Sequence, residues 1–349
     1  MDVPTTPAPA GRALDLADLT TLRLGGPAAD LVEAHDEAAL VEAVRSADAS
    51  GLPVLLVGGG SNLVVADEGY PGRVVVVRNT GRRVEGDLCG GAYVEFGAGE
   101  RWDDVVAAAV ENEWIGIEAL SGIPGTVGAT PIQNVGGYGQ EVAQTIAQVR
   151  TWDRVENQVR TFAAADCGFG YRTSRFKQAP GRHVVLSATF QFRLGDRGAP
   201  VQYAELAAAL DIATGERAPS RDVREAVLAL RRRKGMVLDP DDHDTWSTGS
   251  FFTNPVVPAG DVPAGAPAWP QPDGLAKTSA AWLIEHAGFE KGYGNDRVRL
   301  SSRHTLAITN RGGATTADLL ALARELRDGV QERFAITLVN EPVLVGCEL

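Results

Sequence analysis

Cysteine is scarce in this sequence, and long apolar runs are missing from it. The 349 residues include three cysteines, Cys89, Cys167 and Cys347, which are odd in number and lie far apart. This spacing excludes a disulfide framework and a CxxC metal-binding pattern, and it favours a reducing compartment. We therefore interpret them as ordinary buried thiols and predict no metal site. No run of 18 apolar residues occurs, so no transmembrane helix is predicted.

Positive charge is also in deficit. The chain has 33 lysines and arginines against 45 aspartates and glutamates, which gives a formal net charge of −12. Because nucleic acids and acidic membranes attract basic surfaces, neither is an expected partner. A small anionic substrate is compatible with this balance, since a local basic pocket can act within an acidic protein. Residues 1–18 lack a basic start followed by an apolar core, so we predict no signal peptide and expect a cytoplasmic protein.

The remaining composition is that of a globular protein, with 44% hydrophobic and 22% charged residues. Its length suggests two or three domains. Residues 1–18, rich in Pro and Ala, are predicted to be a disordered tail, and 256–274 a surface loop. Asp36 is predicted to cap one helix, and Ser220 to cap another that reaches Lys234. Further strands are predicted at 52–57, 73–78, 93–96, 183–194, 304–309 and 336–345, and further helices at 102–112, 277–287 and 316–334.

A glycine-rich loop, GGGSN at 58–62, follows the strand predicted at 52–57. Consecutive glycines allow positive φ and a close approach of the backbone to a ligand, and their N–H groups can form an anion-binding nest. Such a loop can hold a pyrophosphate, or it can be a tight turn between strands, and both interpretations stay open. It is not a G-x-G-x-x-G motif that opens a helix, and no Lys-Ser/Thr pair follows as in a Walker A loop.

A second stretch, residues 116–139, holds seven glycines and two prolines beside apolar isoleucine and valine. A plain surface loop is more polar than this. Glycine-rich apolar backbone is typical of a segment laid against a flat, buried ligand such as a flavin ring, although a tightly packed structural loop has the same composition. Residue patterns alone therefore indicate a nucleotide-binding α/β protein.

Seven ordered motifs carry a closer resemblance. They are TLRLGGPA at 21–28, GGGSNL at 58–63, GAGERW at 97–102, GIEALSGIPGTVGATPIQNVGGYGQE at 116–141, CGFGYRTSRFK at 167–177, GSFFTNP at 249–255 and NEPVLVG at 340–346. Together they span nearly the whole chain. In content and order they resemble UDP-N-acetylenolpyruvoylglucosamine reductase, also called UDP-N-acetylmuramate dehydrogenase. One glycine loop is weak evidence, whereas this series is specific.

The resemblance implies an α+β fold with three domains. A two-part FAD-binding module of the vanillyl-alcohol-oxidase (PCMH) type is followed by an α+β substrate-binding domain. On this basis residues 19–79 form the first FAD-binding subdomain and 80–235 the second, and the substrate-binding domain covers 236–334. The C-terminal strand, within 335–349, is expected to rejoin the second subdomain.

The implied reaction is the NADPH-dependent reduction of UDP-N-acetylglucosamine enolpyruvate to UDP-N-acetylmuramate in peptidoglycan precursor synthesis. FAD is the implied non-covalent cofactor, and NADPH is a co-substrate. NADPH gives a hydride to FAD, and the reduced flavin gives one to the methylene carbon of the enolpyruvyl group. The neighbouring carbon must then be protonated. This step requires a proton donor, a cation for the carboxylate and stabilisation of the developing negative charge.

Three residues match the family's catalytic positions. Ser250 matches the proton donor, although a serine after glycine is by itself usually a turn residue. Arg172 matches the arginine whose permanently charged fork binds the substrate carboxylate, and the alternative is a surface arginine or one that pairs with Asp166. Glu341 matches a glutamate that, if burial keeps it protonated, can donate a hydrogen bond to the enolate. Its alternative is a carboxylate that pairs near the chain end.

Other residues match binding positions. Tyr203 resembles a tyrosine that closes over the substrate, while Lys234 and Arg231 suit its diphosphate, although the basic run 231–234 also suits a solvated helix end. His304 suits either a substrate contact or a structural histidine. The substrate-binding set is Tyr203, Arg231, Lys234, Asn254 and His304. The FAD-binding set is Gly58, Gly59, Gly60, Ser61, Asn62, Gly122, Pro124, Gly125, Thr126, Gly128 and Gly139, with the pyrophosphate near 58–62 and the isoalloxazine near 116–139.

Two other functions compete with this one. A flavin oxidase on the same scaffold shares the glycine loops but has no reason to keep Arg172, Ser250 and Glu341 in these motifs. A catalytically dead nucleotide-binding module is disfavoured because all three positions hold the required residue types. A colourless purified protein would favour the dead module.

Overall fold

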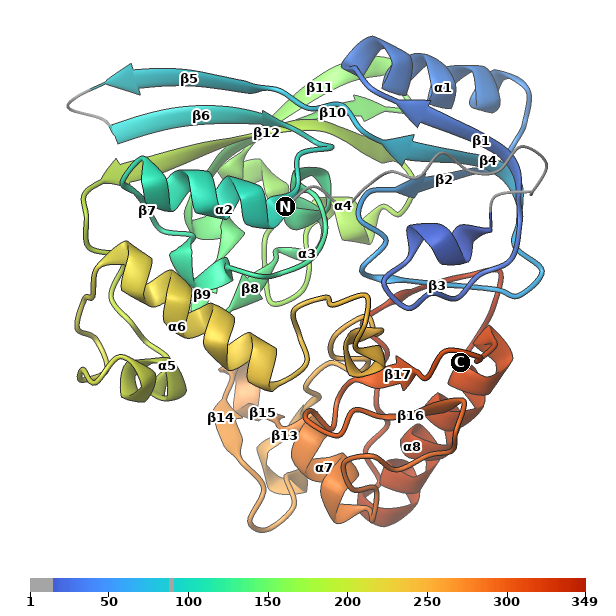
Figure 1. Ribbon diagram of the computed structural model, residues 1–349, viewed down its shortest axis with the longest axis vertical. Helices are drawn as coiled ribbons and strands as arrows, with labels where there is room; N and C mark the ends of the chain where they lie inside the picture. Colours follow the sequence, from blue (N-terminus) through green and yellow to red (C-terminus); the bar gives the residue numbers. More distant parts are fainter. Residues whose placement is uncertain (1–14, 88–90) are drawn as a thin grey trace.

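The N-terminal part of the chain folds as a small parallel sheet with one helix on it. The computed structural model describes residues 15–87 and 91–349. Helix α1 (Glu37–Ala49) covers one face of the sheet (Figure 1). As predicted, Asp36 caps it, since the Asp36 carboxylate accepts a 2.7 Å hydrogen bond from Ala39 N. The strands run in the order β1 (Ala28–Ala34), β4 (Tyr70–Val77) and β2 (Val54–Val57).

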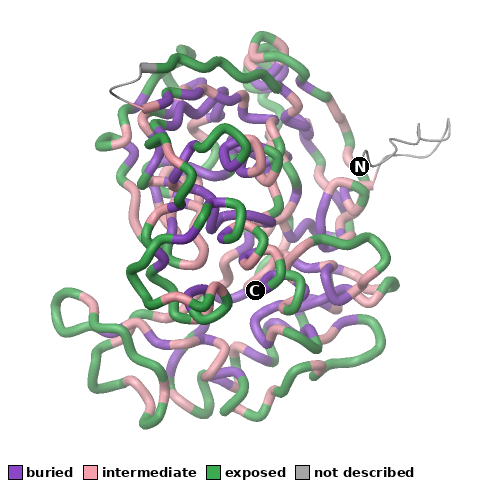
Figure 2. Tube along the Cα trace, turned by 60° about the vertical axis from the view of Figure 1, so that its left-hand side comes forward, coloured by how far each residue is buried: buried purple, intermediate pink, exposed green. Residues whose placement is uncertain are grey.

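A larger antiparallel sheet follows and supplies the main core. Phe190 and Phe192 of its central strand are fully buried, and the Phe190 ring lies 5.8 Å from the ring of Trp102 at the start of α2 (Trp102–Glu111). Burying each such phenylalanine contributes roughly 1.5–3 kcal/mol. Figure 2 shows the buried stretches running through the interior and the exposed loops outside. The strand order is β11 (Gln158–Ala163), β10 (Ile146–Asp153), β12 (His183–Leu194), β6 (Gly91–Gly97) and β5 (Arg82–Asp87), with β7 (Trp114–Ile115) paired to the end of β12.

Two helices, α5 (Ala204–Ala209) and α6 (Ser220–Arg233), lead from this sheet to the third part of the chain. Helix α6 buries Val223, Val227 and Leu230 as its apolar spacing predicts, but Ser220 does not cap it. Pro219 takes the cap position, because Ser220 has already entered the helix, where its buried hydroxyl has no partner among the described residues. Four further elements lie between strands of the large sheet in chain order: α3 (Thr130–Gln133), β8 (Gly136–Gly137) and β9 (Gln140–Glu141) precede β10, and α4 (Arg175–Gln178) lies between β11 and β12.

The third part packs two helices against short strands. Helix α8 (Thr316–Phe334) has the predicted bounds, and Thr315 caps it. Helix α7 (Ala280–His286) begins later than predicted, because Ser279 caps it through Trp282 N and leaves the preceding residues in a strand. The strands are β13 (Val256–Pro258), β15 (Leu275–Thr278) and β14 (Ala268–Pro270) in one sheet, and β16 (Val298–Leu300) with β17 (Ile308–Asn310) in another.

Two sequence predictions in this part are therefore wrong in detail. The segment 256–274 is not only a surface loop, because residues 256–258 and 268–270 within it pair with β15 on either side and form a sheet. The strand predicted at 304–309 is shortened to β17. Its first residues form a turn instead, closed by a 3.0 Å hydrogen bond from Ala307 N to His304 O.

The C-terminal strand differs from the prediction in both extent and partner. Only β18 (Val343–Val345) is a strand, and it pairs in parallel with β3 (Leu63–Val65), which lies in the first predicted subdomain rather than the second. Ile336 and Leu338 are buried in the core of the third part, so the backbone there follows that core instead of a sheet. The C-terminal segment therefore ties the third part to the first, while the domain boundaries stay predictions.

The last four residues of the predicted tail, 15–18, are part of the folded chain. Leu16, in the 3₁₀ helix η1 (Leu16–Leu19), is 1% exposed, and its N–H donates to Gly26 O at 2.8 Å. Residues 1–14 of the predicted tail, and Cys89, lie outside the described residues. Cys167 is buried as predicted, whereas Cys347 is only partly buried. Within residues 15–87 and 91–349, no helix combines the length and hydropathy needed to cross a bilayer.

Candidate active site

All three parts of the chain contribute to one cavity. The backbone of Phe251 links the segment that contains Ser250 to the segment that contains Glu341, since its C=O accepts a hydrogen bond from Glu341 N (2.8 Å). Its N–H donates to Leu306 O (2.7 Å). The Phe251 side chain is fully buried, which holds the neighbouring Ser250 against the cavity wall. Nine predicted site residues line this cavity, namely Ser61, Asn62, Pro124, Gly125, Thr126, Arg172, Arg231, Ser250 and Glu341.

The two glycine-rich loops pack against each other at the wall of this cavity. Ser61 Oγ donates to Pro124 O (3.2 Å), and the next residue, Gly125, accepts a hydrogen bond from Trp102 N (3.1 Å). A Cβ on Gly59 would lie 2.6 Å from Gly125 Cα, and Gly125 itself has a φ of +120° that disfavours other residues. Because Gly59 and Gly125 have no side chains, the two backbone segments can pack closely together beside the cavity.

We expect Gly59→Ala to lose bound flavin and to lower the melting temperature. The new Cβ meets the backbone of Gly125, so no side-chain rotation can relieve the clash. A destabilisation of about 1–3 kcal/mol is expected. Flavin absorbance after gel filtration and thermal unfolding measure the two effects. Gly260→Ala is the control, because its Cβ would have no neighbour within 4 Å. If Gly59→Ala kept the flavin content of the parent protein, close packing of Gly59 against Gly125 would not be needed for flavin binding.

Arg172 and Glu341 form an ion pair in the cavity. Arg172 Nε lies 3.1 Å from Glu341 Oε1, and Arg172 Nη2 donates to Gly136 O (2.9 Å). Arg172 thus pairs with Glu341 rather than with Asp166. Burial raises the pKa of Glu341, because the cost of removing the carboxyl group from water exceeds the stabilisation by Arg172 and Lys177. Glu341 is therefore closer to its protonated form than an exposed glutamate.

Lys177 is a neighbour of this pair that the sequence analysis missed. Its Nζ donates to Gln133 Oε1 and to Arg172 O, both at 2.9 Å. Burial lowers the pKa of Lys177, and the charge of Glu341 opposes that effect. A signal was present in the sequence, since Lys177 is the last residue of the same motif that contains Arg172.

Two buried polar atoms on residues that line the cavity have no hydrogen-bond partner among the described residues. They are Arg231 Nε and Thr248 Oγ1. Arg231 is 7% exposed, and its Nη2 donates to Met236 O at 3.0 Å. Burial lowers the pKa of Arg231 to about 10, so the side chain remains charged at neutral pH. Because unpaired buried polar atoms are costly, this wall is suited to a polar or anionic ligand. Sequence reasoning found Arg231 but missed Thr248, which carries no motif signal.

Two predicted substrate contacts form a cluster beside α6, off the cavity lining. Lys234 Nζ pairs with Glu205 (2.6 Å) and lies 5.7 Å from the centre of the Tyr138 ring. Tyr203 is 45% exposed and packs edge-on against the same ring, with centroids 5.4 Å apart. The basic run at 231–234 is thus divided, since Arg231 faces the cavity and Lys234 faces this cluster.

The other two predicted substrate contacts lie in the third part of the chain. The Asn254 side chain accepts a hydrogen bond from Ala280 N (3.0 Å) at the start of α7, which is a structural role. His304 Nε2 lies 3.4 Å from Ser250 Oγ, so this histidine belongs to the surroundings of the predicted proton donor.

Several glycines predicted to contact FAD are explained by packing within the protein. A Cβ on Gly122 would meet Leu228 Cδ2 at 2.8 Å, and one on Gly128 would meet Ala98 Cβ at 2.7 Å. Gly139 lies on a separate cavity. The predicted FAD contacts that do not line the central cavity are Gly58, Gly59, Gly60, Gly122, Gly128 and Gly139.

The residues that do line the cavity fit a flavin dinucleotide. Such a cofactor needs backbone N–H groups near its pyrophosphate and a flat apolar wall for its ring. Residues 61–62 and 124–126 bring backbone from the two glycine-rich loops to the cavity, and Ile123, Ala129 and Val135 add apolar surface. In the described ranges, no group of three or more His, Cys, Asp and Glu residues is arranged to hold a metal ion.

Comparison with known proteins supports both halves of this arrangement. A family model described as an FAD binding domain matches residues 28–161. A second model, described as the C-terminal domain of UDP-N-acetylenolpyruvoylglucosamine reductase, matches residues 239–345. The predicted α+β fold, an FAD-binding module followed by a second domain, is thereby confirmed.

Similarity to whole proteins covers nearly all of the chain. It is 56% identical over 350 residues to the UDP-N-acetylenolpyruvoylglucosamine reductase of Cutibacterium acnes, covering 99% of this chain and 93% of that protein. It is 52% identical to the same enzyme of Thermobifida fusca, covering 97% and 98%. The crystal structure of the Thermus caldophilus reductase matches 95% of this chain and 97% of its own, with a TM-score of 0.63 and 26% identity. Together these matches show that the chain belongs to the UDP-N-acetylenolpyruvoylglucosamine reductase family.

Proposed function

We propose that this chain catalyses the NADPH-dependent reduction, through FAD, of UDP-N-acetylglucosamine enolpyruvate to UDP-N-acetylmuramate. This is a step of peptidoglycan precursor synthesis, and hence of cell wall biogenesis, in the cytoplasm. The observation that carries the proposal is the convergence of Arg172, Ser250 and Glu341 on one cavity beside the two glycine-rich loops. Family membership supports the same reaction.

The cofactor would be held by residues 61–62 and 124–126, with its ring against the apolar wall. FAD held there would supply the hydride-transfer chemistry between NADPH and the methylene carbon of the enolpyruvyl group. The loops at 58–62 and 116–139 pack together through Gly59 and Gly125, so no side chain of these two glycines would separate the backbone from the cofactor.

The chain's own residues manage the carboxylate and the proton. Arg172 offers a planar, permanently charged fork to the substrate carboxylate. Ser250 lines the cavity and gives its hydroxyl proton to the α-carbon, so that one proton and one hydride add across the double bond. Burial favours protonation of Glu341 and the charge of Arg172 opposes it; the protonated form would donate a hydrogen bond to the enolate oxygen and limit the charge that develops there.

The diphosphate of the substrate needs compensating positive charge. The buried Arg231 supplies charge at the cavity wall, and Lys234 supplies more where it lies over the Tyr138 ring, which packs against Tyr203. Substrate binding would draw Lys234 away from Glu205, its present partner. Tyr203 is exposed enough to close over the bound substrate.

An anaerobic absorbance experiment tests the proposal. The purified protein is expected to be yellow, to bleach when NADPH is added and to regain its colour when enolpyruvyl-UDP-N-acetylglucosamine follows. Oxygen is excluded because it would reoxidise the flavin by itself. A protein that NADPH bleaches but this substrate does not reoxidise would retain the flavin assignment and overturn the substrate. A colourless protein that takes up no FAD would overturn both.

A further inference from the structure

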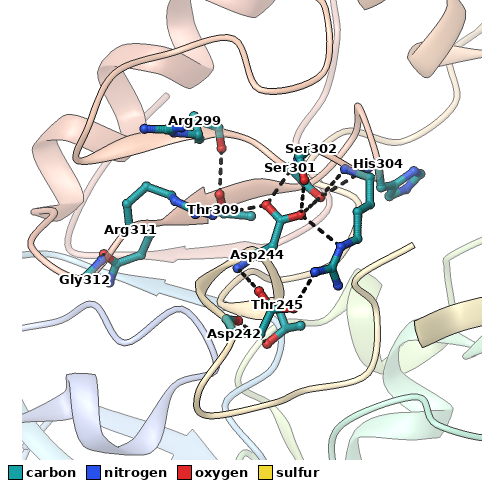
Figure 3. Close-up of polar contacts among 12 residues, drawn as sticks. Asp242, Asp244, Thr245, Arg299, Ser301, Ser302, His304, Thr309, Arg311 and Gly312 are labelled. Carbon is teal, nitrogen blue, oxygen red and sulfur yellow. Dashed lines mark hydrogen bonds and ion pairs between the residues drawn. The ribbon is translucent and has the colours of Figure 1, made fainter. Parts of the chain in front are cut away.

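Asp244 is a buried carboxylate where two segments of the third part meet, residues 244–250 and 301–304. Its side chain and backbone are 5% exposed. Asp244 Oδ2 accepts hydrogen bonds from Ser301 Oγ (3.0 Å) and Ser302 Oγ (2.8 Å), and Oδ1 accepts one from Ser302 N (3.2 Å). Figure 3 shows the carboxylate at the centre of these contacts. A buried carboxylate with this many partners fixes both segments relative to each other.

Two arginines complete the surroundings of this carboxylate. Arg311 Nη1 lies 3.1 Å from Asp244 Oδ1, and Arg303 Nε lies 3.6 Å from Oδ2. The pKa of Asp244 is lowered, because hydrogen bonds from Ser302 and Ser301 and the charge of Arg311 outweigh its desolvation. Asp244 is therefore charged at neutral pH and holds its donors firmly.

Ser301 connects Asp244 to the backbone of His304 through hydrogen bonds. Ser301 is fully buried, and its Oγ accepts hydrogen bonds from Arg303 N (3.0 Å) and His304 N (3.2 Å) while donating to Asp244. On the other side, His304 O accepts from Ala307 N (3.0 Å), and Ser301 N donates to Ala307 O (2.8 Å). The main chain of His304 is thus fixed at both its N–H and its C=O.

The imidazole held in this way faces the predicted proton donor. His304 Nε2 lies 3.4 Å from Ser250 Oγ, a separation typical of catalytic hydrogen bonds that tighten when substrate binds. Burial lowers the pKa of His304 to about 4, so its ring is neutral at pH 7. The charged groups around the ring are Lys234, Lys291 and Arg231, which lower the pKa further, and Glu285, which opposes them.

We propose that His304 is a positioning residue for Ser250 in the reaction proposed above, on which this inference rests, and that Asp244 holds His304 in place through Ser301. As Ser250 gives its proton to the α-carbon, negative charge builds on Oγ and needs a hydrogen-bond donor. The Nε2–H of a neutral imidazole supplies that donor and leaves the serine hydrogen free to point into the cavity. Ser250 Oγ then regains a proton from water, and His304 stays neutral throughout.

Rapid-mixing absorbance on the FAD-loaded enzyme separates the two halves of the reaction. We expect His304→Ala to slow reoxidation of the reduced flavin by enolpyruvyl-UDP-N-acetylglucosamine by about 10- to 100-fold. Bleaching by NADPH should stay within about twofold of the parent enzyme, because no proton from Ser250 enters that step. The solvent deuterium isotope effect on reoxidation should rise as proton transfer becomes limiting. His304→Gln, whose amide N–H can replace Nε2–H, should recover much of the rate.

Asp244→Asn should slow the same step by about 10-fold, because a displaced imidazole no longer meets Ser250 Oγ. Two controls separate positioning from general structural damage. His286→Ala removes an exposed histidine that stacks on Trp282, and it should change neither half-reaction. Asp318→Asn makes the same chemical change in the cap of α8, and it should lower the melting temperature without slowing reoxidation.

Three outcomes would overturn the positioning role while leaving the proposed function intact. The first is reoxidation of His304→Ala at the parent rate, and the second is equal slowing of both half-reactions. The third is a glutamine variant no faster than alanine with an unchanged isotope effect. A parent enzyme that NADPH bleaches but the substrate does not reoxidise would instead overturn the proposed function, and this inference with it.

Discussion

Ser250→Ala is expected to slow reoxidation of the reduced flavin by the substrate by about 10²- to 10⁴-fold, the range for loss of a positioned general acid. Reduction by NADPH should be nearly unchanged. The substitution removes one oxygen from the cavity wall, while the buried Phe251 and its two backbone hydrogen bonds keep the main chain in place. The loss should therefore be chemical rather than structural.

Rapid mixing of NADPH-reduced enzyme with substrate, in the absence of oxygen, measures this step. Ser279→Ala is a matched control, because it removes a hydroxyl of the same type that caps α7 and does not line the cavity. It should cost about 1 kcal/mol of stability and leave both half-reactions unchanged. If the Ser250 variant reoxidises at a rate close to the parent's, another group supplies the proton.

Glu341→Ala is expected to slow the same half-reaction by about 10²- to 10³-fold, as for loss of one donor to a developing oxyanion. Glu341→Gln should retain more activity, since its amide can donate a hydrogen bond where the protonated carboxyl does. Both variants remove the negative charge beside the Arg172 guanidinium, so the difference between them reports the hydrogen bonds that the glutamine amide can still make. Equal losses would count against a donor role for Glu341.

The pH dependence of these variants provides a second readout. Burial raises the pKa of Glu341 above its ordinary value of 4.5, so its protonated form persists to higher pH than that of an exposed glutamate. The reoxidation rate should fall as pH rises through this raised pKa, and that decline should be absent from Glu341→Gln. Stability has the same sign, because a raised carboxyl pKa contributes below 4.5 and its contribution is lost as pH rises through the folded value. Thermal unfolding across this range checks the second effect.

Elements with local signals were predictable, and elements that depend on distant partners were not. Helix α8 has the predicted bounds, because its cap and its apolar spacing are encoded within its own residues. Strands β13 and β14 were missed, since their Pro/Ala/Gly-rich sequence resembles a loop and their extended form depends on pairing with β15. The partner of β18 was mistaken for the same reason, because nothing within 335–349 encodes which strand edge is free.

The candidate site was also predictable only in part. The motifs predicted that Arg172, Ser250 and Glu341 belong to one site. In the structure, all three line one cavity. Glycine content marked the right segments but did not separate residues that line the cavity from those that allow backbone packing, such as Gly59 and Gly128. Both uses require the same absent side chain, so composition cannot distinguish them.

By itself, the sequence determined the family, the order of the main elements and the residue types available for proton transfer and carboxylate binding. The tertiary structure alone decided the pairing of Arg172 with Glu341, the division of the 231–234 run between two surfaces and the support of His304 by Asp244. Each of these depends on burial and on hydrogen bonds between residues far apart along the chain. Charge and donor strength at such positions are set by the surroundings that folding assembles, and not by the residue type.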